Sequence, residues 1–69
     1  MTYLVIYEKT NTGYSAYVPD LLGCVATGSS KQEVSQNIKE AIAFHIEGLE
    51  EEGLPIPAPT SESELMEVA

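Results

Sequence analysis

The stretch SKQEVSQNIKEAIAFHIEGLEEEGLP, residues 30–55, decides the fold because it is typical of one amphipathic helix with a signal at each end. Ser30 followed three residues later by Glu33 is a capping box, in which the serine hydroxyl accepts a hydrogen bond from a backbone N–H of the first turn. Gly53 can adopt the left-handed backbone that ends a helix, and Pro55 cannot continue one. We therefore predict a helix over about residues 31–52. Its apolar stripe, which a sheet or another helix must cover, recurs every three or four residues: Val34, Ile38, Ala41, Ile42, His45 and Leu49.

The residues before the helix predict three β-strands. Residues 3–8 are β-branched and aromatic, residues 14–18 alternate in polarity after a glycine-containing turn, and residues 23–28 lead directly into the helix cap. This order of elements predicts an α+β domain of two layers, β-β-β-α with an optional last strand. The sheet would be antiparallel and three-stranded, with one helix on one of its faces.

We assign residues 1–59 to this domain and residues 60–69 to an acidic tail. Prolines 55, 57 and 59 alternate with other residues, a pattern that favours an extended path. Residues 65–68 are interpreted as a short edge strand, with a frayed tail as the alternative.

The 69 residues make a small core, which commonly needs a disulfide, a metal or self-association for stability. Cys24 is the only cysteine and His45 the only histidine, so an internal disulfide and a metal cluster are both excluded. Both faces of the first strand are apolar, whereas one helix covers only one face of a sheet. We therefore expect self-association, with an interface drawn from the first two strands: Tyr3, Val5, Tyr7 and Tyr17.

The charge is strongly acidic, with 3 Lys+Arg against 11 Asp+Glu and a net charge of −8. This balance argues against binding to a phosphate backbone and favours attraction to a basic partner. Tyrosines on paired strands can stack nucleic-acid bases, but without interleaved cations we interpret them as cross-strand packing. No apolar run reaches membrane-spanning length and the start lacks a leader pattern, so we expect a cytoplasmic protein that binds neither membrane nor nucleic acid.

Enzyme chemistry finds little support in the residues. His45 lies on or beside the helix stripe without a partner nearby in the sequence, and Cys24 lies among small and apolar residues without a positive neighbour. We predict a protein that is not an enzyme and needs no cofactor. An enzyme that uses His45 with a tail carboxylate is the least favoured alternative.

Three segments together resemble the HicB family of antitoxins and their short relatives: GYSAYVPDLLGCVATG at 13–28, AIAFHIEGLE at 41–50 and GLPIPAP at 53–59. The resemblance implies a partial ribonuclease-H-like fold and self-association into a homodimer or homotetramer. It also implies the binding of a small basic HicA-type toxin that cleaves mRNA. Many members of the family carry a C-terminal DNA-binding domain. We expect no such domain within the 69 residues and no direct DNA contact from them.

The leading hypothesis is therefore an antitoxin-like interaction protein that binds and neutralises a HicA-type toxin. We expect the partner to contact the acidic end of the helix and the loop after the second strand, through Asp20, Leu21, Leu22, Glu47, Glu50 and Glu51. The alternative is a stand-alone oligomeric HicB-like module without a toxin partner.

Overall fold

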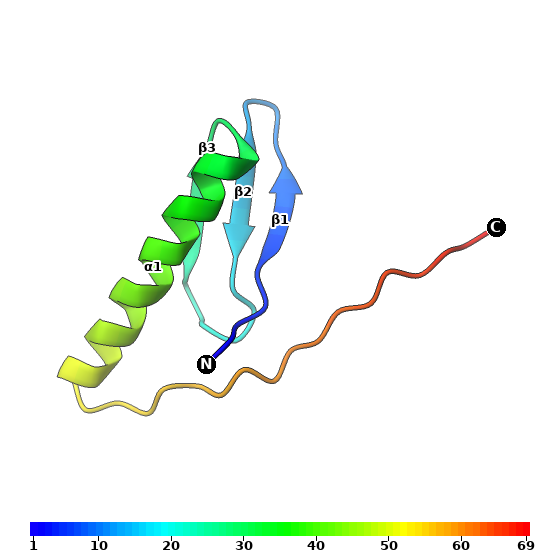
Figure 1. The fold of residues 1–69 in the computed structure, drawn as a ribbon. Helices are drawn as coiled ribbons and strands as arrows, with labels where there is room; N and C mark the ends of the chain where they lie inside the picture. Colours follow the sequence, from blue (N-terminus) through cyan, green and yellow to red (C-terminus); the bar gives the residue numbers. More distant parts are fainter.

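The computed structural model describes residues 1–69 and shows three strands and one helix in two layers (Figure 1). The elements are β1 (Ile6–Lys9), β2 (Tyr14–Tyr17), β3 (Val25–Gly28) and α1 (Lys31–Glu51). Both strand pairs are antiparallel and the order in the sheet is β1-β2-β3. The predicted α+β class is confirmed, while the ribonuclease-H-like detail stays an expectation from the resemblance.

Both ends of α1 form the caps that the sequence predicts. At the start, the Ser30 hydroxyl accepts a hydrogen bond from the Glu33 backbone N–H at 3.1 Å, and the Glu33 carboxylate accepts one from the Ser29 hydroxyl at 3.0 Å. At the end, Gly53 has a φ of +68°, and the Leu54 backbone N–H donates to the Leu49 carbonyl at 2.9 Å. The last two features make a Schellman motif, which terminates the helix.

The core lies between α1 and the β2–β3 half of the sheet. Tyr7, Ala16 and Ala26 are directly opposite one another across the three strands, so they share the face on which α1 packs. Six side chains are fully buried: Ala16, Val18, Leu21, Cys24, Val34 and Ile38.

Only the first half of α1 supplies the core. Its buried residues are Val34 and Ile38, whereas His45 and Leu49 are half-exposed. The reason is length, because a helix of 21 residues spans about 31 Å while a strand of four residues spans about 13 Å. The C-terminal half of α1 therefore extends past the sheet and diverges from it (Figure 1). We expected the whole apolar stripe of the helix to face the core. It does so only as far as Ile42, which is partly buried and packs against the core.

The strands are shorter than the sequence pattern suggests. Pairing of β1 begins at Ile6, opposite Tyr17, and residues 3–5 stay outside the ladder. Val18, the next position along β2, donates its N–H to the Cys24 carbonyl, in register with the β2–β3 pairs, but its carbonyl accepts from the Leu21 N–H within the following loop. The turn at Leu21 ends the ladder.

The last strand, expected at residues 65–68, is not formed. Residues 54–69 contain neither helix nor strand and run as an extended tail away from α1 (Figure 1). The alternating prolines remove backbone donors and hold the chain extended, so residues 55–59 offer no regular ladder to a strand. Beyond them the side chains of Leu65, Met66 and Val68 are exposed to solvent. No helix of the protein has both the length and the apolar character needed to cross a membrane.

Candidate interaction surfaces

The four residues expected at a subunit interface lie on two different faces. Tyr3, Val5 and Tyr7 pack against the core from the helix side. The Lys31 ammonium lies 5.3 Å from the centroid of the Tyr7 ring, which places that ring beside α1. Tyr17 is on the opposite face of the sheet, since its neighbour Ala16 is buried under the helix and successive strand residues alternate. The expected residues therefore do not form a single patch.

The open face of the sheet carries its own apolar group. Ile6, Tyr17 and Val25 are directly opposite one another across the three strands, and no helix covers them. Tyr17 is 38% exposed and Val25 is 63% exposed. We name these three residues the open-face cluster. Val25 was not among the predicted interface residues, although the alternation of the third strand was the signal that could have placed it beside Tyr17.

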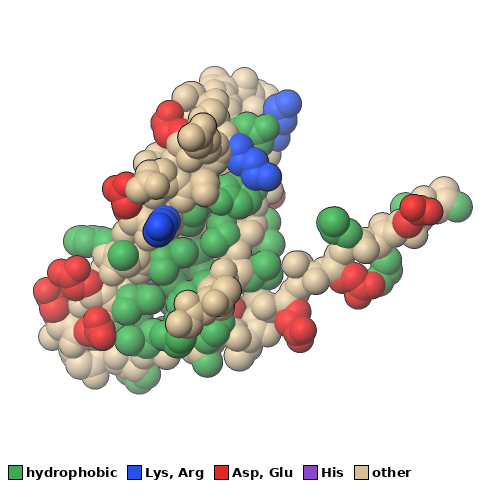
Figure 2. Space-filling model, in the orientation of Figure 1, with side chains coloured by type: hydrophobic (Ala, Val, Ile, Leu, Met, Phe, Trp, Pro, Cys, Tyr) green, Lys and Arg blue, Asp and Glu red, His purple; other side chains and the backbone are tan.

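A second apolar area lies on the helix side, where α1 covers β2 and β3 and leaves β1 partly bare. Figure 2 shows hydrophobic side chains gathered beside the helix, between it and the adjoining strands. Val5, Tyr7 and Ile42 are only half-buried there. Both sides of β1 therefore expose apolar atoms, which agrees with the expectation that its two faces need cover.

The acidic residues gather at the C-terminal end of α1. Glu47, Glu50 and Glu51 are all exposed, and spacings of three and four place them on neighbouring positions of the helix surface. The last turn holds no basic residue, and Figure 2 shows acidic side chains grouped at this end of the helix. Because the C-terminus of a helix carries partial negative charge, these carboxylates are in an unfavourable position for the isolated chain.

The loop after β2 separates its two leucines. Leu22 is 95% exposed, while Leu21 is 1% exposed and belongs to the core. Gly23 has a φ of +82°, and the Cys24 backbone N–H closes the turn on the Leu21 carbonyl at 3.1 Å. Leu21 therefore closes the end of the core, and its side chain is not accessible on the surface of the loop. Leu22 alone presents an apolar group there.

Asp20, in the same loop, binds the tail of its own chain. Its carboxylate accepts hydrogen bonds from both the backbone N–H and the hydroxyl of Thr60 and of Ser61, at 2.8–3.2 Å. The Ser61 backbone N–H contributes most to lowering the pKa of Asp20 below its ordinary value, followed by the Ser61 hydroxyl. A further tie comes from the Tyr3 hydroxyl, which donates to the Pro57 carbonyl at 2.5 Å. These contacts hold residues 57–61 against the loop and the N-terminal segment.

The residues considered for catalysis are not assembled into a site. Cys24 is buried, and burial raises the pKa of its thiol, so the reactive thiolate form is disfavoured. His45 is half-buried on α1, and no three His, Cys, Asp or Glu side chains are placed together to hold a metal ion. The arrangement offers surfaces for binding and no cluster of acid, base and nucleophile.

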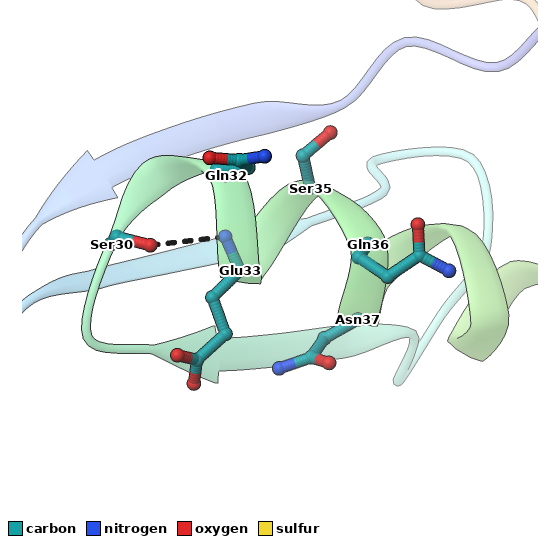
Figure 3. A pocket seen from close by; sticks show the side chains of 6 residues that line it. All are labelled: Ser30, Gln32, Glu33, Ser35, Gln36 and Asn37. Atoms are coloured by element: carbon teal, nitrogen blue, oxygen red, sulfur yellow. Dashed lines mark hydrogen bonds between the residues drawn. The ribbon is translucent and has the colours of Figure 1, made fainter.

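A polar hollow lies near the start of α1 (Figure 3). No hydrophobic side chain lines it, and Glu33, its one ionisable group, already accepts a hydrogen bond from Ser29. The hollow is a solvated part of the capped helix end, lined by Ser30, Gln32, Glu33, Ser35, Gln36 and Asn37.

Phe44 is an exposed aromatic residue that sequence reasoning missed. It is 79% exposed on α1, and it follows Ile42 by two residues, which places it about 200° around the helix from that core-facing side chain. The sequence signal that could have identified Phe44 as exposed was its position outside the apolar stripe of the helix.

The chain was compared with known proteins by sequence and by structure, and the family match and the structural matches agree. The family described as "HicB_like antitoxin of bacterial toxin-antitoxin system" matches residues 3–68. An "Uncharacterized 14.9 kDa protein in rep-hol intergenic region" of Haemophilus phage HP1 is 46% identical over 57 residues, which are 83% of this chain.

Two solved structures share the fold. A chain of the "HicA3 and HicB3 toxin-antitoxin complex" is 40% identical, with a TM-score of 0.74, over 87% of this chain and 70% of that one. The "Antitoxin HicB3 crystal structure" is also 40% identical, with a TM-score of 0.71, over 87% of this chain. The chain spans only 43% of the phage protein and 44% of the latter antitoxin chain.

Proposed function

Because this chain belongs to the HicB-like antitoxin family of bacterial toxin–antitoxin systems, we propose that it binds and neutralises a small basic toxin of the HicA type. The observation that carries the proposal is the exposed acidic end of α1, on a chain with a net charge of −8. A toxin that cleaves mRNA needs a basic surface for its substrate. An acidic protein that docks on that surface competes directly with the RNA.

The contact surface that we propose consists of Glu47, Glu50 and Glu51 together with Leu22. Asp20 contributes indirectly, because its carboxylate is occupied by Thr60 and Ser61 of the same chain. Exposed carboxylates steer a basic partner during its approach and fix its orientation, while apolar contacts supply much of the affinity.

We further propose that the protein acts by binding and not by catalysis, in the cytoplasm where mRNA is translated. The related chain in the HicA3 and HicB3 toxin-antitoxin complex supports a protein partner. Cys24 is inert by burial, and the acidic groups of α1 are spread along a solvated helix face.

Co-expression with a HicA-type toxin tests the proposal. We expect the untagged chain to co-purify with the tagged toxin and to restore the growth of cells that the toxin arrests. Toxin recovered alone, together with persistent growth arrest, would contradict it. A catalytically inactive toxin variant serves as the binding control, because it is tolerated by cells in the absence of antitoxin.

A second function, a stand-alone oligomeric module, is favoured by the open-face cluster. Ile6, Tyr17 and Val25 form an uncovered apolar row that a second copy of the chain can cover. We propose a homodimer or homotetramer in either case. The absence of any toxin complex, combined with a stable oligomer in light scattering, would favour this module over the antitoxin.

A further inference from the structure

Phe44 has no structural partner within the chain. It lies on the part of α1 that extends past the sheet, and 79% of its surface is exposed. Scattered exposed leucines are common in soluble proteins, but a phenylalanine on the outward face of a helix exposes a large rigid apolar area. The packing of this chain gives no reason for an aromatic side chain at position 44.

Gly48 lies one helical turn after Phe44 and on the same side of α1. A glycine inside a helix lowers its stability relative to alanine, so a packing or functional reason is expected. Here an added Cβ would meet nothing within 4 Å, and the backbone φ is not in the left-handed region. Neither space nor backbone conformation in the chain itself requires glycine at this position.

A partner explains both residues together. A side chain such as Phe44 can fill a pocket on a partner surface, and a neighbouring glycine lets the partner approach the helix backbone closely. Each residue is unfavourable or neutral for the isolated helix, and each gains a role when a protein surface docks on this side.

The charges around Phe44 identify the chemistry of that partner. Glu40, Glu47 and Glu51 stand four residues before, three after and seven after Phe44, which places them around its ring on the outward face. Lys39 is the only cation on this part of the helix, whose last turn has none. An apolar anchor ringed by carboxylates fits an apolar pocket bordered by Lys or Arg side chains, and Arg can also stack on the aromatic ring.

We infer that Phe44 and Gly48 form the anchor point at which a basic protein partner docks on the projecting half of α1. The inference rests on the proposed function for the class of partner, and it assigns the central contact to residues outside the acidic set proposed above. The glutamates then act as the rim of the contact, and Phe44 as its centre.

Binding of the full chain to the purified HicA-type toxin, measured by isothermal titration calorimetry, tests this inference. We expect Phe44→Ala to weaken binding by about 30-fold, the range of an aromatic hot spot, and to leave the melting temperature nearly unchanged. Gly48→Ala should raise the melting temperature by about 4 °C and yet weaken binding, because the added methyl group stabilises the helix and obstructs the partner. Leu65→Ala, which shortens an exposed apolar side chain of the tail outside the proposed contact surface, is the matched control and should leave binding unchanged.

The outcomes separate this inference from the proposed function. If the wild-type chain does not bind the toxin, both are overturned. If it binds, but Phe44→Ala and Gly48→Ala bind equally tightly, the inference fails while the function stands. A change of oligomeric mass in Phe44→Ala without a change in toxin affinity would also overturn it, since the face would then belong to a second copy of the chain.

Discussion

The Asp20 carboxylate accepts two hydrogen bonds from Ser61, a residue 41 positions further along the chain: one from its backbone N–H at 3.0 Å and one from its hydroxyl at 2.8 Å. Thr60 donates to the same carboxylate in the same two ways. One carboxylate thus holds residues 60 and 61 of a tail that has no regular secondary structure, beside the hydrogen bond from Tyr3 to Pro57. The loop that precedes β3 and the segment that follows α1 are joined by this one group.

Replacement of Asp20 by Asn should release the tail, because an amide presents one acceptor oxygen where the carboxylate presents two. We expect the backbone N–H groups of Thr60 and Ser61 to exchange with solvent markedly faster, as measured by NMR hydrogen exchange, while the amides of α1 stay protected. Glu64→Gln, which removes the same charge from an exposed tail residue, should leave that exchange unchanged.

The same contact has a predictable pH dependence. Since the hydrogen bonds lower the pKa of Asp20 below its ordinary value of 3.8, the contact is fully present above that pH. It is lost as the pH falls through the lower pKa of the folded protein. The backbone N–H resonances of Thr60 and Ser61, followed by NMR, should therefore change below pH 3.8, and in Asp20→Asn that transition should be absent. A tail transition near neutral pH would contradict this account.

Reversal of charge at the end of α1 tests the proposed contact surface. In Glu50→Lys with Glu51→Lys, we expect toxin affinity to fall by about tenfold or more, mainly through slower association, and its dependence on salt to weaken. Surface plasmon resonance at several ionic strengths gives both quantities. The control is Glu62→Lys with Glu64→Lys, which makes the same change of net charge in the exposed tail. An equal loss in both double variants would show that only the net charge matters.

The open-face cluster should hold the oligomer together. A lysine in place of Tyr17 or Val25 would bring a charge into an apolar contact, so we expect the mass in multi-angle light scattering to fall to that of a single chain. The fold should remain, because both side chains are exposed in the isolated chain. Leu22→Lys, at an exposed site away from the sheet face, is the control. If both sheet variants keep the mass of the oligomer, the interface does not lie on the open face and we would assign it to the helix side of β1.

Two glycines should respond to alanine in opposite directions. A Cβ at Gly13 would lie 2.1 Å from the Gly28 carbonyl oxygen, a backbone atom that cannot move without disturbing the end of β3. We expect Gly13→Ala to destabilise the fold by about 2–3 kcal/mol or more in chemical denaturation, as overpacking does. Gly48→Ala should stabilise it by about 0.5–1 kcal/mol, since that Cβ meets nothing and alanine favours the helix.

Local signals predicted most of this fold. The capping residue Ser30 and the terminating Gly53 act through neighbours three to five residues away, so the sequence contains the whole motif. The three strands and the segments that resemble the family are likewise patterns of a few consecutive residues, so the sequence was enough to predict them. The length of α1 relative to the sheet was not predictable in the same way, because the end of strand pairing depends on how Val18 is used within the next loop.

The surfaces were predicted less well than the elements. Tyr7 and Tyr17 were predicted to share one interface, because alternation within a strand does not say which residues of two strands share a face. The register pairs Tyr7 with Ala16 and Ile6 with Tyr17, so the two tyrosines lie on opposite faces. Leu21 and Leu22 look alike in sequence, and only the turn around Gly23 buries one and exposes the other. The contact of Asp20 with Ser61 joins residues that are 41 positions apart in the sequence, so no local pattern predicts it.

Inhibition of the toxin tests the central claim most directly. A purified HicA-type toxin is titrated with this chain, and the cleavage of a defined mRNA is measured at each ratio. We predict that cleavage falls to background near stoichiometric amounts of the wild-type chain, whereas Phe44→Ala requires a large excess. Cleavage that continues undiminished in the presence of excess wild-type chain would contradict the account.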